Sequence, residues 1–192
     1  AVETLDPLVD PAKHLAVVLE SVGGGSAPAG QPRIVKLRGA AMDPAVVAIT
    51  PHTKVRFQNT DAFIYQPQCE ANSQMESGTA LPPREQIDYA FDEPGIYEIR
   101  DGRFPNLRGW VVVANSTMSQ NPRAGTKAGE ASFSFENVQP GNYKVKVFFD
   151  GEWIAERQVE VTEDDPEGLH ITLPEDGQQH EQSDDSSAGN GQ

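Results

Sequence analysis

Short apolar or alternating segments, separated by Gly, Pro and Asn, constrain the fold of this chain more than any other feature of its sequence. Residues 131–135 (Ala-Ser-Phe-Ser-Phe) and 143–147 (Tyr-Lys-Val-Lys-Val) alternate, so that their large apolar side chains share one face. Gly141 and Gly151 stand between such segments, and glycine supplies the positive φ that tight turns need. No long amphipathic helical pattern occurs. The sequence therefore predicts an all-β protein.

The strand-like segments form two groups, separated by residues 116–129, which are rich in Ser, Asn, Gly and Pro. This break predicts two β-sandwiches, over residues 13–115 and 130–174, with 116–129 as the linker. Residues 1–12, interrupted by two Asp-Pro steps, are expected to form an extended lead-in. The predicted strands are 14–20, 33–37, 46–50, 54–59, 86–91, 95–100 and 110–114 in the first group, and 131–136, 141–150, 152–162 and 169–173 in the second.

The formal net charge of −14 is concentrated towards the C-terminal end. All 15 Lys and Arg lie at or before Arg157, whereas ten of the 29 Asp and Glu follow it. Residues 175–192 have no apolar residue larger than Ala and are expected to form a disordered acidic tail, which either solubilises the protein or docks on a partner. The rest of the chain lacks the basic footprint that phosphate backbones require, so nucleic-acid binding is not expected.

The sequence offers few residues for catalysis. Its single cysteine, Cys69, excludes an intramolecular disulfide and a thiolate cluster. No Gly-x-Ser-x-Gly elbow and no phosphate-binding glycine motif occurs, and Asp92-Glu93 before Pro94 is better explained as a polar turn than as a catalytic pair. No segment approaches the roughly 20 apolar residues of a membrane span. We therefore expect neither enzymatic activity nor a transmembrane segment.

Two stretches of the chain resemble known families. Residues 46–61, residues 91–97 (Phe-Asp-Glu-Pro-Gly-Ile-Tyr) and the apolar segment 110–113 resemble, in order and spacing, the cupredoxin family of plastocyanin-like proteins. Residues 133–145, with the pattern Phe-x-Phe, Val, Pro-Gly, Tyr and Val, look like a carboxypeptidase regulatory-like (transthyretin-like) sandwich. The resemblance implies a cupredoxin-like Greek-key sandwich followed by a second small β-sandwich.

A type 1 copper site needs two His, one Cys and usually a weakly bound Met. By the resemblance, the four ligand positions correspond to Tyr65, Asp101, Phe104 and Leu107. No Cys, His or Met lies anywhere in residues 76–113, so a shifted alignment does not restore the ligand loop. The resemblance therefore implies a cupredoxin domain without copper, and no cofactor is expected. A displaced, irregular metal site built from His52, Cys69 and Met75 remains an alternative.

The segment that replaces the ligand loop, residues 100–110, contains three Arg in a chain that is acidic overall. In cupredoxins this end of the sandwich also carries the surface on which partners dock, so the resemblance implies a partner-binding surface here. Arg and aromatic residues are frequent interface anchors. The residues predicted to form this surface are Phe63, Tyr65, Arg100, Arg103, Phe104, Leu107 and Arg108. Alternatively, the aromatic side chains only fill the vacated metal cavity, and Asp101 pairs with an Arg.

These observations favour an exported, non-enzymatic binding or scaffolding protein. The combination of the two domains resembles exported bacterial plastocyanin-like proteins. It implies a periplasmic or extracellular location at the bacterial envelope and a protein partner, such as a membrane complex of which this chain is an accessory subunit. A redox or metal-binding protein with the displaced site is one alternative. A carbohydrate- or cell-wall-binding module is another, although two Trp and four Tyr offer little aromatic platform.

Overall fold

The computed structural model describes residues 2–3, 11–23, 31–115, 118–120, 123–124, 130–162 and 171–172. Over these residues the chain is all-β, as predicted, and its single helix is one turn, α1 (Pro11–His14). No helix in the described part of the chain is long and apolar enough to cross a membrane. The predicted acidic tail, residues 175–192, lies outside the described residues.

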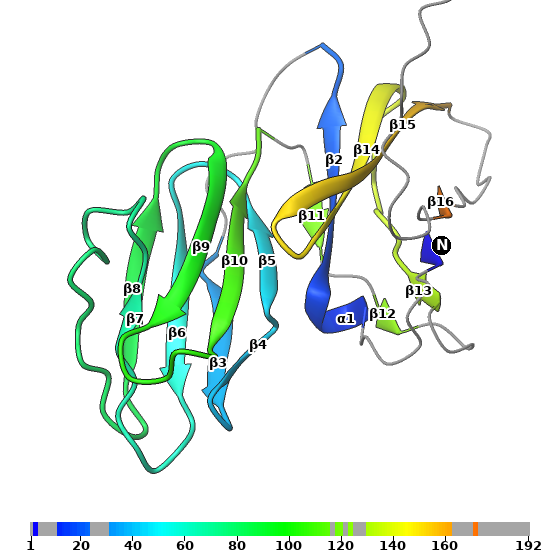
Figure 1. Cartoon of the computed structure of the whole chain (residues 1–192). Helices are drawn as coiled ribbons and strands as arrows, with labels where there is room; N and C mark the ends of the chain where they lie inside the picture. The colour runs from blue at the N-terminus through cyan, green and yellow to red at the C-terminus, as the bar shows by residue number, and fades with distance from the viewer. Residues whose placement is uncertain are drawn as a thin grey trace, which may run out of the picture.

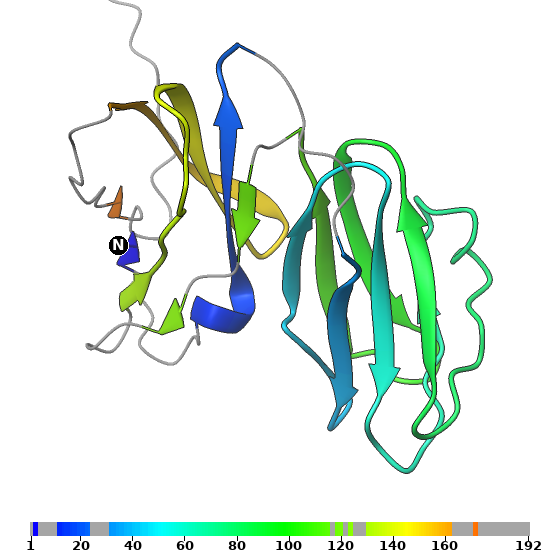
Figure 2. The same cartoon turned by 180° about the vertical axis from the view of Figure 1, so that it is seen from behind.

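Residues 31–115 contain two four-stranded sheets, which we call the first sandwich (Figures 1 and 2). One sheet has the order β4 (Ala41–Asp43), β3 (Arg33–Arg38), β6 (Thr53–Asn59), β8 (Gln86–Phe91). The other has the order β5 (Val46–Ile49), β10 (Arg108–Val113), β9 (Gly95–Asp101), β7 (Pro67–Gln68). Strands β3 and β6 are parallel, as are β5 and β10, and the other neighbours are antiparallel.

Alternation along the strands places the large apolar side chains between these two sheets. In β6, Val55 and Phe57 are fully buried, whereas Lys54 is exposed. The largest fully buried side chains of this core are Leu37, Phe57, Tyr65, Met75, Phe91, Ile99 and Leu107. The two-residue period seen in the sequence thus decides which face of each strand enters the core.

Strand β2 (Leu15–Ser21) does not belong to the first sandwich. It pairs with β14 (Gly141–Phe149) on one side and with β11 (Met118–Gln120) on the other. Strand β15 (Glu152–Val161) completes this third sheet, whose order is β11-β2-β14-β15. The assignment of this strand to the predicted domain 13–115 is therefore wrong, and the first sandwich is inserted between β2 and β11 (Figure 1).

The burial of β2 explains its central place. Its first five residues, 15–19, are all buried, and a strand buried on both faces needs a layer on each side as well as a neighbour at each edge. A continuous apolar run identifies such a strand but does not specify its partners. Strand β11 also lies within the predicted linker 116–129, which is therefore not a plain connection.

The sheet formed by β5, β10, β9 and β7 is covered on one face by the other sheet of the first sandwich and, along β5 and β10, on the opposite face as well. Val47, Ile49, Val111 and Val113 belong to the core of the first sandwich. A second cluster joins the opposite face of this sheet to the third sheet: Val46, Ala48, Trp110, Val112 and Ala114 with Ala16, Val18 and Phe148. Every residue of β5 is buried as a result. Three sheets are therefore stacked, with β5-β10-β9-β7 in the middle.

The third sheet has its own core on the face turned away from the first sandwich. Leu15, Val17, Leu19, Tyr143, Val145 and Val147 form this core. Phe133 and Phe135 pack against this core. A small sheet has the order β12 (Arg123–Ala124), β13 (Glu130–Ser132), β1 (Val2–Glu3), β16 (Ile171–Thr172).

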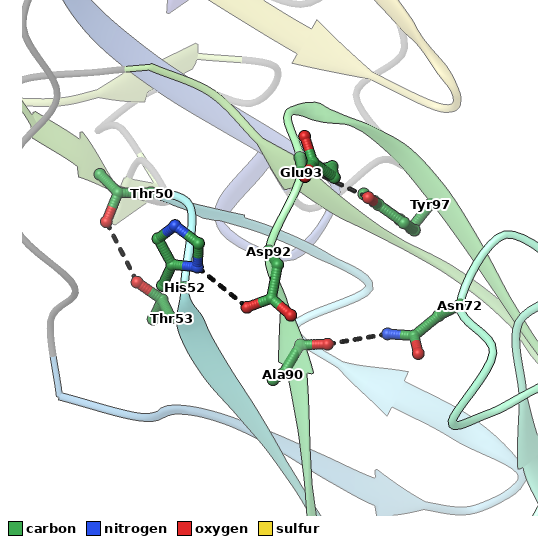
Figure 3. Close-up of polar contacts among 8 residues, drawn as sticks. All are labelled: Thr50, His52, Thr53, Asn72, Ala90, Asp92, Glu93 and Tyr97. Atoms are coloured by element: carbon green, nitrogen blue, oxygen red, sulfur yellow. Dashed lines mark hydrogen bonds and ion pairs between the residues drawn. The ribbon is translucent and has the colours of Figure 1, made fainter.

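The core of the first sandwich and the core of the third sheet each contain the same tyrosine hydrogen bond, in a strand that begins at the Gly of a Pro-Gly step. The hydroxyl of Tyr97 donates a hydrogen bond to the carbonyl of Glu93 (2.9 Å; Figure 3). The hydroxyl of Tyr143 donates to the carbonyl of Gln139 (2.8 Å). Each tyrosine thus buries its ring in a core while its polar tip closes the preceding turn.

Candidate functional site

The loops that follow β6 and β9 meet at one end of the first sandwich, which is the lower end in Figure 1. We call residues 61–66 and 101–107 the loop end. The amide of Gly102 donates to the carbonyl of Gln66 (3.0 Å), so the two loops are joined through their main chains. All four positions that the resemblance assigns to copper ligands lie here, and this is where a metal would be expected.

Tyr65 occupies the first of these positions and is fully buried. Its hydroxyl donates to Asp61 Oδ2 (2.6 Å) and accepts from the amide of Ala40 (2.9 Å). Burial, and then the hydrogen bond to Asp61, raises the pKa of the Tyr65 hydroxyl far above its ordinary value. The phenol is therefore neutral at physiological pH and both its donor and an acceptor position are used, so it does not suit a metal.

Asp101, at the second position, is a buried carboxylate that holds the loop together. Its Oδ2 accepts from the amide of Gln66 (2.6 Å), and its Oδ1 accepts from the amides of Arg103 (2.9 Å) and Phe104 (3.1 Å). In the described structure these main-chain amides are its partners, so the alternative of a pair with an Arg side chain is wrong. The carboxylate satisfies backbone donors that the turn would otherwise leave unpaired.

Phe104 and Leu107 close the remaining two positions with apolar side chains. Leu107 is 2% exposed, and half-buried Phe104 packs on the ring of Tyr65 at a centroid distance of 5.2 Å. Phe63 completes an aromatic trio, 4.9 Å from Phe104 and 5.1 Å from Tyr65. The loop end is thus a filled plug. Its donor set does not fit copper, which requires imidazole and sulfur ligands.

The three residues of the alternative metal site are not assembled into one. Cys69 and Met75 are both buried in the core of the first sandwich, where the amide of Cys69 donates to the carbonyl of Met75 (3.2 Å). Burial raises the pKa of the Cys69 thiol, which opposes the thiolate that metals bind. His52 lies at the surface with Nδ1 3.0 Å from Asp92 Oδ1 (Figure 3). Among the described residues no group of three His, Cys, Asp or Glu is placed to hold a metal.

Arg100 and Arg108 lie on the face of the middle sheet that also carries Glu98 and Trp110. They lie opposite each other in the β9–β10 register, and both contact the carboxylate of Glu98, at 3.0 Å and 2.5 Å respectively. The guanidinium of Arg108 also lies over the ring of Trp110, 4.6 Å from its centroid. Hydrogen bonds from Arg100 and Arg108 lower the pKa of the Glu98 carboxyl. These two arginines are therefore engaged within the chain.

The predicted partner surface is consequently only partly exposed. Tyr65 and Leu107 are buried and therefore offer no contact surface. The sequence indicates that both residues lie in loops, but it does not determine the direction of their side chains. Phe63 is 40% exposed, Phe104 is half-buried, and Arg103 is exposed. The structure brings Phe63 and Phe104 into contact, leaves Arg103 exposed in the same loop as Phe104, and places Arg100 and Arg108 on a sheet face.

Sequence reasoning missed a groove of about 810 Å³ between the middle and third sheets, near the start of β9 and the end of β10. We call it the layer groove. Ile96 and Trp153 line it and are 40% and 36% exposed. Lys146 Nζ and Glu20 Oε2 form an ion pair of 2.9 Å on its wall. Its residues come from five strands, so the groove follows from β2 joining the third sheet, for which the sequence has no local signal.

No protein-family model and no curated protein matches the chain. The solved structures similar to it include cupredoxins, over about half its length. A reduced amicyanin variant is 16% identical, with a TM-score of 0.40, and the match covers 51% of this chain and 98% of amicyanin. A purple cupredoxin from Nitrosopumilus maritimus is 20% identical (TM-score 0.38; 43% and 99% covered). A Cu-containing nitrite reductase from Thermus scotoductus SA-01 is 21% identical (TM-score 0.39; 59% and 28% covered).

Proposed function

We propose that this chain is a copper-free, non-enzymatic binding protein that acts outside the cytoplasm and docks a protein partner at the loop end of the first sandwich. The closure of the ligand positions is the observation that carries the proposal. Tyr65, Asp101 and Leu107 are each at most 5% exposed. The polar atoms of Tyr65 and Asp101 are already engaged in hydrogen bonds, to Asp61 and to main-chain amides.

The surface above the plug supports a binding role. Phe63 remains 40% exposed although it rests on Phe104 and Tyr65. A ring that is held in place from below loses little side-chain freedom when a partner covers it, which favours binding. Arg103 is exposed in the other loop of the loop end, 101–107, and its side chain has no ion-pair partner among the described residues. An exposed aromatic ring and an exposed guanidinium in the two loops of one end suit a partner with an apolar patch and a carboxylate.

The competing function, electron transfer through a displaced metal, has weaker support. It would use Cys69 and Met75, two residues that are 2% and 0% exposed. A metal would have to enter a packed core and bind a thiol whose pKa is raised by burial. The location at the bacterial envelope, and the role as an accessory subunit of a membrane complex, rest on the sequence resemblance.

The test is capture of the partner from envelope extracts by the immobilised chain, followed by affinity measurement with the purified partner. We expect Phe63→Ala to weaken binding about 30-fold, which corresponds to about 2 kcal/mol for an interface anchor. Arg103→Ala is expected to weaken it less. The matched control is Lys54→Ala, an exposed change at the start of β6 and therefore at the other end of that strand. Full affinity in both loop-end variants would refute docking at the loop end.

A further inference from the structure

We propose that the layer groove binds a neutral carbohydrate, with one sugar ring stacked on Trp153. The site is separate from the loop end, so the inference does not depend on the proposed function. Its volume of about 810 Å³ lies within the range of small-molecule sites, roughly 300–1,000 Å³. Paired strands from two packed sheets form its walls, so the site is largely preformed.

Trp153 provides a flat apolar surface held in a defined orientation. Its ring makes a T-shaped contact with Phe148 at a centroid distance of 5.5 Å, and Lys146 Nζ lies over the ring at 5.4 Å from its centroid. The side chain nevertheless stays 36% exposed. Ile96, 40% exposed, lines the same groove from β9. A sugar ring presents C–H groups on its faces and hydroxyls at its edge, so it can cover an exposed indole while its edge remains hydrogen-bonded.

The polar side chains of the groove fit the hydroxyls of an uncharged ligand. Glu20 and Lys146 neutralise each other at 2.9 Å, so this wall carries a donor and acceptors without an unbalanced charge. Ser21 and Asn115 add further donors and acceptors. A charged ligand would find no free counter-charge in this pair. A purely apolar ligand would remove water from it without replacing the lost hydrogen bonds, at an energetic cost.

The experiment uses the full chain and a panel of neutral oligosaccharides: gluco-, manno-, galacto- and N-acetylglucosamine oligomers. Tryptophan fluorescence is a suitable signal, because the chain has two Trp and Trp110 is only 9% exposed. Calorimetry confirms each hit. We expect at least one oligosaccharide to bind with a Kd between micromolar and millimolar. Trp153→Ala should weaken it at least tenfold, and Trp153→Phe, which retains a ring against Phe148, should weaken it less.

Two controls keep the test decisive. Ile34→Ala removes an exposed apolar side chain from β3, in the sheet farthest from the groove, and should leave sugar binding unchanged. Circular dichroism and thermal unfolding establish that each variant is folded. The inference is overturned if no member of the panel binds, or if binding survives Trp153→Ala. Binding of a proline-rich peptide instead, also through Trp153, would assign the groove to peptide recognition and likewise overturn it.

Discussion

The loop end and the layer groove both lie at the margins of the sheet β5-β10-β9-β7, but they are built in opposite ways. At the loop end the polar atoms of Tyr65 and Asp101 bond to main chain or to a neighbouring side chain, and apolar side chains fill the space between them. In the layer groove Ile96 and Trp153 stay exposed, and Glu20 and Lys146 pair at its surface.

The contrast between the loop end and the layer groove shows where a concave surface forms in this molecule. The end to which the resemblance assigns a metal site is filled by Tyr65, Phe104 and Leu107. The opening lies instead where the third sheet covers the middle sheet incompletely. The concave surface therefore arises from the packing between layers.

The largest effect is expected from truncating a side chain of the plug. Tyr65→Ala removes a fully buried ring, leaves the amide of Ala40 without this acceptor and takes one of two donors from Asp61 Oδ2, so we expect a loss of about 3–5 kcal/mol in the free energy of unfolding. Trp153→Ala, at a partly exposed site, should cost clearly less. Urea unfolding followed by circular dichroism measures both. Equal losses would mean that the loop end is no more tightly built than the groove.

A pH experiment tests whether Arg100 and Arg108 are bound to Glu98 and are therefore less available to a partner than Arg103. Because Arg100 and Arg108 lower the folded pKa of Glu98, their contribution to stability is complete above the ordinary glutamate value of about 4.3. It is lost as the pH falls through the lower folded pKa. We expect less than about 1 kcal/mol, since the arginines are more than half exposed.

NMR titration of the Glu98 carboxyl checks the direction of the shift. In unfolding experiments Glu98→Gln should be slightly less stable than the unchanged chain at pH 7, and the two should converge in acid. A gap that persists at low pH would show that Glu98 acts through packing and not through its charge.

The last prediction is that copper does not bind. Addition of Cu(II) should produce no intense thiolate-to-copper absorption in the visible region, because the ligand positions hold Tyr65, Asp101, Phe104 and Leu107 and because Cys69 is buried. Metal analysis after desalting should find no stoichiometric copper. A coloured, stoichiometric complex that disappears in Cys69→Ser would restore the displaced metal site and with it the redox function.

The sequence indicated which positions form the plug, but not which of their side chains are buried and which are exposed. The resemblance named four positions for the ligands, and the structure brings these positions to one end of the first sandwich. It could not foresee that Asp101 accepts three main-chain amides, or that Tyr65 and Leu107 turn inward while Phe63 stays exposed. Side-chain direction in an irregular loop depends on the hydrogen bonds available from other segments, which no local pattern records.

What the sequence by itself determined is the all-β character of the chain and the faces of its strands, because a two-residue period of apolar side chains is a local property. The absence of Cys, His and Met from residues 76–113 is likewise read directly from it. Only the tertiary structure decided that β2 pairs with β14 and that the first sandwich is inserted between β2 and β11. Strand pairing between residues more than 120 positions apart depends on which apolar surfaces fit together in three dimensions. The layer groove is a consequence of that choice.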